Sequence, residues 1–242
     1  MKKVLVIIIP VSIIVLISIM ILVTNKKVNT KDYVTFESRI EDVKESELKE
    51  ETNVYGWIQV QGTNIDYPVI EEKKSIFLRD IDYIWRLNTY IEGMNREVVS
   101  GHNIQNISSN PLIANPNHKR FEQLLSFVDY DFAKKNLYIQ YTKDGKDELY
   151  KIYAVSFIDA EDEDGAGVAD DKIADYIKAT KKTSIYDYDI DVNDKDTLIA
   201  LVTCTRYYGA DSKTNFRVDA RKVRKNEKIN KYSVTKTKNY DR

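Results

Sequence analysis

The sequence predicts a mainly β domain with peripheral helices, preceded by one N-terminal transmembrane helix. Short runs in which apolar and polar residues alternate recur too closely for a regular βαβ series. Tyrosine has 17 copies, whereas glycine and proline have only 8 and 4, a usage typical of a packed β-rich domain rather than of a disordered chain. With 242 residues, 43% of them hydrophobic, the chain is long enough for one domain with its own core.

The transmembrane helix is expected over residues 4–23, after a short flank of residues 1–3. These 20 residues carry no charge and are bordered by lysine pairs on both sides. At ~1.5 Å per residue the run spans about 30 Å, the thickness of a bilayer's hydrocarbon core. A cleaved signal peptide would have a shorter apolar region that ends in small residues, whereas this run ends in Met20-Ile21-Leu22-Val23. The balanced lysines do not fix the orientation.

The remaining elements follow from periodicity. Residues 24–52 are polar, with an amphipathic stretch that predicts a stalk and N-terminal helices. Residues 56–70 alternate on either side of Gly62, which predicts a hairpin with one buried face. Helices are expected at about Phe121–Tyr130 and Asp170–Lys181. Further strands are predicted over Glu97–Ser100, Leu137–Thr142, Leu149–Ile158, Thr197–Cys204 and Phe216–Val223.

Composition excludes several classes of function. The 37 basic and 38 acidic residues give a net charge of −1, so no overall field would attract nucleic acid. One cysteine cannot form an internal disulfide, and one cysteine with two histidines is too few for a structural zinc site. The acidic loop 159–165 has Ala160 where an EF-hand needs an acid, which favours a solvated loop. We expect no metal and no cofactor.

Cys204 is the candidate nucleophile. It ends the apolar run 196–204 where a polar and aromatic segment begins, so strand pairing would fix its backbone while its side chain reaches the rim. A buried structural cysteine is an equal alternative on position alone.

A cysteine attacks as the thiolate and therefore needs a nearby histidine or another cation. His102 follows a predicted strand, whereas His118 lies in a polar loop with no rigid element beneath it. The strand-end position favours His102, because a proton-transfer group must hold its hydrogen-bond geometry. Gly101 is expected to remove steric cover beside it.

Attack on an amide carbonyl also creates an oxyanion that needs a positive charge or aligned N–H donors. Arg206, Arg217 and Arg221 follow Cys204. Arg217 shares a strand face with Asn215, Asp219 and Arg221 by the period of two, and that polar face is alternatively a solvated one.

Together these motifs resemble a sortase. Val202-Thr203-Cys204 ends one strand, Ser100-Gly101-His102-Asn103 lies about a hundred residues earlier, and a basic residue follows the cysteine. The stretch from Gly56-Trp57-Ile58 to Tyr67-Pro68-Val69-Ile70 is similar to the opening strands of class B sortases. So is the approach to the cysteine through Ser184-Ile185-Tyr186-Asp187. The resemblance covers about residues 53–223.

The resemblance implies a closed β-barrel of about eight strands with added helices over residues 53–225, followed by a polar C-terminal tail over 226–242. It further implies a single-pass enzyme with its catalytic domain on the outer face of a Gram-positive cell membrane. Such a cysteine transpeptidase, of the thiol peptidase class of hydrolases, would cleave the C-terminal sorting signal of secreted surface proteins. It would then transfer the acyl group to an amine of a cell-wall precursor or a pilin.

Carried over residue by residue, the family's histidine falls on His102 and its cysteine on Cys204, whereas its arginine has no direct match. Counting back six residues from Arg221 reaches Asn215, so we predict Arg217, two residues further along, as the oxyanion group, with Arg206 as alternate. Further candidates for substrate or oxyanion contacts are Asn103, Thr203 and Asn215. A sortase-like scaffold with a decayed active site, or a hydrolytic cysteine protease, is the alternative function.

Overall fold

The computed structural model describes residues 33–48, 54–71, 84–86, 95–103, 121–160, 172–209, 211 and 213–241. The predicted transmembrane segment, residues 4–23, lies outside this part of the chain. Within the described ranges no helix is long and apolar enough to cross a membrane.

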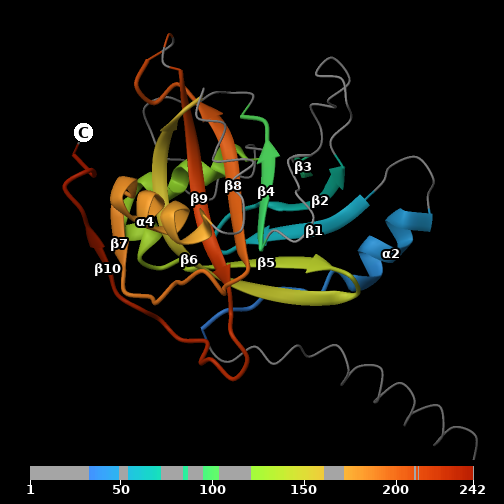
Figure 1. Cartoon of the computed structure of the whole chain (residues 1–242). Coiled ribbons are helices and arrows are strands. Elements are labelled where there is room, and N and C mark those ends of the chain that lie inside the picture. The colour runs from blue at the N-terminus through green and yellow to red at the C-terminus, as the bar shows by residue number, and fades with distance from the viewer. Residues whose placement is uncertain are drawn as a thin grey trace, which may run out of the picture.

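The described strands build a closed barrel in the order β1-β2-β3-β4-β8-β9-β6-β5 (Figure 1). The β2–β3 and β4–β8 pairs are parallel, and the other pairs of the barrel are antiparallel. Closure confirms the expected barrel of about eight strands. The barrel strands are β1 (Val54–Val60), β2 (Asp66–Glu71), β3 (Ile84–Arg86), β4 (Arg96–Gly101), β5 (Tyr138–Lys143), β6 (Lys146–Asp159), β8 (Leu198–Thr205) and β9 (Thr214–Lys222).

The predicted hairpin is confirmed as β1 and β2. Gln59 pairs with Asp66, and the amide of Val60 donates to the carbonyl of Ile65 at 3.1 Å across the turn. Gly62 has φ +76°, a left-handed conformation that favours glycine. The short strand β3 was not predicted, because three residues are too few to show a period.

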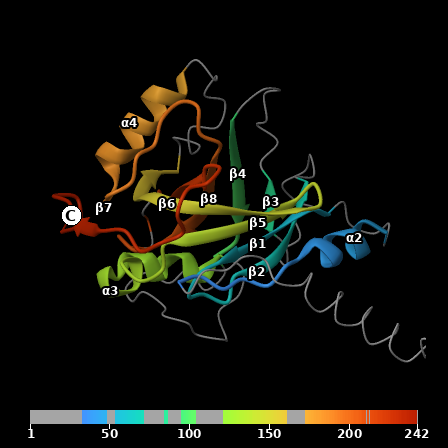
Figure 2. The ribbon, with the colours of Figure 1, turned by 90° about the horizontal axis from the view of Figure 1, so that it is seen from below.

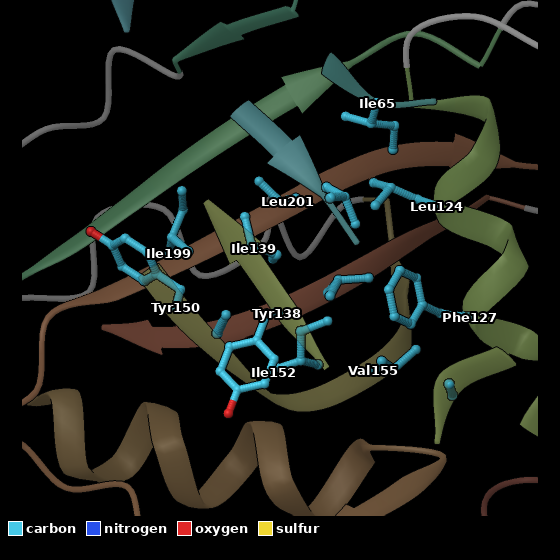
Figure 3. Packing of buried hydrophobic residues seen from close by; sticks show 14 of the residues in the cluster. Ile65, Leu124, Phe127, Tyr138, Ile139, Tyr150, Ile152, Val155, Ile199 and Leu201 are labelled. Atoms are coloured by element: carbon cyan, nitrogen blue, oxygen red, sulfur yellow. The ribbon is translucent and has the colours of Figure 1, made fainter. Parts of the chain in front are cut away.

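Buried side chains from the strands and from the η2 helix fill the barrel interior (Figure 3). Leu124 and Phe127 of η2 (Glu122–Val128) point toward Tyr138, Ile139, Ile152 and Val155 of the neighbouring strands. Inward positions alternate along β8, where Ile199 and Leu201 belong to this core. This alternation is the period-two pattern from which the strands were predicted.

The helices pack on the outside of the barrel. α4 (Ile173–Thr183) and α3 (Tyr130–Ala133) lie on opposite sides of the strands (Figure 2). α2 (Ile40–Leu48) packs Val43 on Val54 and Ile70. The helix predicted at 121–130 is instead the 3-10 helix η2 followed by α3. Asp129 separates them because it is extended (φ −74°, ψ 123°) and its side chain accepts from the amide of Phe132.

The segment 226–242, predicted as a polar tail, is folded where it is described. β10 (Val234–Lys236) pairs with β7 (Tyr186–Tyr188) at the left of Figure 1. The Tyr232 hydroxyl donates to the carbonyls of Leu137 and Ile152 at 2.8 and 2.7 Å. Composition alone missed this packing because the segment's few tyrosines, rather than an apolar run, anchor it.

Candidate active site

The ends of β4 and β8 bring the two predicted catalytic residues to one edge of the barrel. The strands are parallel, with Ser100 opposite Val202. His102 and Cys204 each follow two residues later, so they lie at corresponding positions on neighbouring strands. Cys204 is exposed, which removes the alternative of a buried structural cysteine. His102 is partly buried.

Asn103 and Thr203 join these two strand ends. The Asn103 side-chain amide donates to the carbonyl oxygen of Cys204 at 3.2 Å, and the Thr203 hydroxyl donates to the carbonyl of Gly101 at 2.8 Å. Both side chains are buried, with 4% and 1% exposure. Both were predicted as substrate or oxyanion contacts, but in this structure their contacts hold the backbones beside the thiol and the imidazole.

Gly101 serves packing rather than access. A Cβ atom there would lie 2.7 Å from the Ile84 side chain and 2.7 Å from the Phe121 ring. The Phe121 amide also donates to the carbonyl of His102 at 3.3 Å. The expectation that Gly101 opens space beside the histidine is therefore wrong. His118 lies outside the described residues.

Arg217 is buried in an ion pair beneath α4. Its Nε donates to Asp219 at 2.8 Å and its Nη2 to the Thr180 hydroxyl at 3.3 Å. The guanidinium also lies 5.3 Å from the centre of the Tyr176 ring. Burial lowers the pKa of Arg217, but the Asp219 carboxylate and Tyr176 outweigh burial and hold that pKa above its ordinary value.

These contacts draw the guanidinium away from the thiol. Asp219 is opposite Ala200, four residues before Cys204 on β8, whereas Arg217 itself is opposite Val202. The contacts favour a structural role, and the predicted oxyanion role of Arg217 stays a prediction. Tyr176, Thr180 and Asp219 were not predicted as its partners. The period of two did place Asp219 on the same face, but it did not show that α4 covers that face.

Asn215 is the residue directly opposite Cys204 in the β8–β9 pair. Directly opposed residues of an antiparallel pair place their side chains on the same face of the sheet. Asn215 is partly buried and Arg206 is exposed just after β8. A neutral amide thus stands nearest to the thiol in the ladder, and the exposed Arg206 is the arginine closest to Cys204 in sequence.

A cavity of about 450 Å³ lies next to this edge, between α4 and the ends of β6 and β9. Its lining includes Asp159, Asp175, Tyr176, Thr180 and Arg217. Arg217 and Asn215 share a strand face, so the cavity adjoins the position opposite Cys204. No group of His, Cys, Asp and Glu side chains suited to a metal ion occurs among the described residues.

Comparison with known proteins identifies the fold. No protein-family model matches the sequence, and no curated protein does. Among solved structures, the chain is similar to Clostridium perfringens sortase B at 24% identity and a TM-score of 0.62, covering 74% of this chain and 100% of that one. Sortase B from the type II pilus of Streptococcus pneumoniae is 23% identical, with a TM-score of 0.59 and coverages of 74% and 96%.

A Staphylococcus aureus sortase B-substrate complex is 18% identical, with a TM-score of 0.58 and coverages of 76% and 85%. At these identities the likeness concerns the fold. The resemblance to class B sortases predicted from the sequence is confirmed at that level.

Proposed function

We propose that this chain is a membrane-anchored cysteine transpeptidase of the sortase type. The observation that carries the proposal is the exposed thiol of Cys204 at the barrel edge where β4 delivers His102. The Asn103 hydrogen bond to Cys204 supports it, because a nucleophile and its proton-transfer partner need a fixed separation. The anchor over residues 4–23 and the extracytoplasmic location of the catalytic domain are parts of the same proposal.

The reaction begins when the Cys204 thiolate attacks a carbonyl of a sorting-signal peptide. A carbon–sulfur bond forms, and the carbonyl π electrons move to the oxygen. The intermediate collapses, the carbon–nitrogen bond breaks, and protonated His102 gives its proton to the departing amine. A thioester on Cys204 remains. The acceptor amine then attacks the thioester, neutral His102 takes the amine's proton, and the thiolate leaves as the new peptide bond forms.

The partners proposed are a sorting-signal peptide and an amine acceptor from a cell-wall precursor or a pilin. One sortase B has been solved with a substrate and another with a triglycine peptide, which supports these two classes of ligand. The cavity beside α4 is the candidate position for the peptide, because it adjoins Cys204 and offers polar groups of both charges. The chemistry proposed requires no metal or cofactor.

Asn215 is the oxyanion donor that the strand register favours. An amide N–H gives a weaker oxyanion contact than a guanidinium, since charge-assisted hydrogen bonds are roughly twice as strong as neutral ones. This same feature favours the second candidate function, a sortase-like binding domain with little or no activity. The two functions differ in the reactivity of Cys204.

Ligation of a sorting-signal peptide panel to triglycine, followed by mass spectrometry, tests the proposal. We expect a ligated product with wild type and none with Cys204→Ala. Thiol labelling should be fast and should slow in His102→Ala. An inert thiol in the native protein would support the binding domain, and cleavage without ligation would support a hydrolytic protease.

The oxyanion group is tested by kcat on the same substrates. Asn215→Ala should lower kcat by about tenfold or more, and Asn215→Arg should raise it. An unchanged kcat in Asn215→Ala, with a large loss in Arg206→Ala, would transfer the role to Arg206.

A further inference from the structure

The described chain enters the domain at the end of the barrel opposite Cys204. The Tyr33 hydroxyl donates to the carbonyl of Lys135 at 2.8 Å, and its ring lies 6.0 Å from that of Tyr138. Tyr138 in turn exchanges hydrogen bonds with the backbone of Asn230 at 2.7 and 3.0 Å. In Figure 1 this entry and the loop before β10 lie at the bottom, whereas the carboxyl ends of β4 and β8 point to the top.

Exposed lysines surround this entry point. We name them the basal lysines: Lys135, Lys225, Lys228 and Lys231. None of these ammonium groups forms an ion pair with a carboxylate of the described residues. The acid between them, Glu227, is already bound by Arg221 and Lys151 at 2.7 and 2.8 Å. The basal lysines therefore present uncompensated positive charge at this end of the barrel.

The short connection to the proposed anchor keeps this charged end near the bilayer. Nine residues, 24–32, separate the apolar run from Tyr33. Even fully extended they span at most about 30 Å. That reach exceeds the Debye length of about 8 Å at physiological salt, so the connection alone permits both a docked and an undocked domain. The charge of the facing surface then decides between them.

We propose that the basal lysines dock the domain on an anionic phospholipid surface, with the Cys204 edge facing away from the bilayer. The inference rests on the anchor of the proposed function. Each lysine near such a surface strengthens binding by about fivefold, so several acting together would favour the docked state strongly. Docking would fix the height and direction of the catalytic edge above the membrane.

The full chain in nanodiscs provides the test. A fluorophore on Asn230→Cys, in a Cys204→Ser background, reports contact with spin-labelled lipid headgroups. The wild-type thiol, labelled at Cys204, is the control probe at the far end of the barrel. We expect at least about fivefold stronger quenching at position 230 in phosphatidylglycerol-containing discs than in phosphatidylcholine discs. Salt at 1 M should remove the difference because it shortens the Debye length to about 3 Å. Cys204 should remain unquenched.

Charge reversal separates the basal lysines from net charge. Lys225→Glu/Lys228→Glu/Lys231→Glu should abolish the lipid dependence. Lys178→Glu/Lys182→Glu/Lys238→Glu, which changes the net charge equally on exposed residues elsewhere, should retain it. Thermal unfolding of both variants checks that the fold is intact.

Three outcomes would overturn the inference. Equal quenching in both lipids would show that the connection alone sets the distance. Displacement by a soluble glycerol-phosphate polymer at matched phosphate concentration would identify an anionic polymer as the occupant. A chain that does not enter nanodiscs would refute the anchor itself, and peptide ligation in solution would then show whether the catalytic part of the proposed function survives.

Discussion

Replacing Arg217 by methionine distinguishes a structural from a catalytic arginine. The change keeps the volume of the aliphatic stem but removes the cation from Asp219. The Asp219 side chain is 1% exposed and that of Arg217 is 6% exposed, so the carboxylate would stay buried without its counter-ion. The Tyr176 hydroxyl, which also donates to Asp219, would remain as a neutral partner.

Breaking a buried ion pair from one side costs about 3–5 kcal/mol, because the other charge is left uncompensated. We expect Arg217→Met to lower the free energy of unfolding by that amount. For a domain of this size each kcal/mol corresponds to about 2–4 °C in the melting temperature. The double variant Arg217→Met/Asp219→Leu should recover much of the loss, since it removes both charges.

Urea unfolding of wild type, both single variants and the double variant measures these values and forms a complete cycle. The ligation rate per folded molecule is measured on the same four proteins. If the structural reasoning holds, the double variant ligates at nearly the wild-type rate. A stable Arg217→Met protein with a kcat reduced by about 10²-fold or more would refute the reasoning and restore Arg217 as the oxyanion group.

Packing and electrostatics give three further predictions. Gly101→Ala should destabilise the domain by about 1–3 kcal/mol, because its methyl group would overlap Ile84 and Phe121; Gly101→Ala/Phe121→Leu should recover part of this in urea unfolding, and full stability of the single variant would contradict the contact. Burial would raise the pKa of Glu227, but hydrogen bonds from Arg221 and Lys151 lower it from 4.5 to about 2. Its contribution to stability is therefore complete above pH 4.5 and is lost as the pH falls toward 2. Unfolding measured against pH should be flatter across this window in Glu227→Gln, and an unchanged slope would argue against the coupling. Removing residues 226–242 should cost at least about 3–5 kcal/mol, since it takes Glu227 from two buried cations; an unaffected melting temperature would show that the segment is dispensable.

The strands of the barrel could be predicted where they are long enough to show their period. Leu149–Ile158 and Phe216–Val223 lie almost entirely within β6 and β9, because inward and outward positions alternate visibly over eight or more residues. β3, β7 and β10 have three residues each and were not predicted. Their pairing depends on partners far away in the sequence.

The sequence by itself determined which side chains reach the catalytic edge. A strand that ends at Cys204 and another that ends beside His102 are local features, and parallel pairing of the two then aligns their ends. Tertiary structure alone decided what covers each outer face. Periodicity placed Arg217 on a polar face, but only the packing of α4 shows that this face is buried and that Asp219 neutralises the cation. The same holds for residues 226–241, because contacts between distant segments leave no period in the chain.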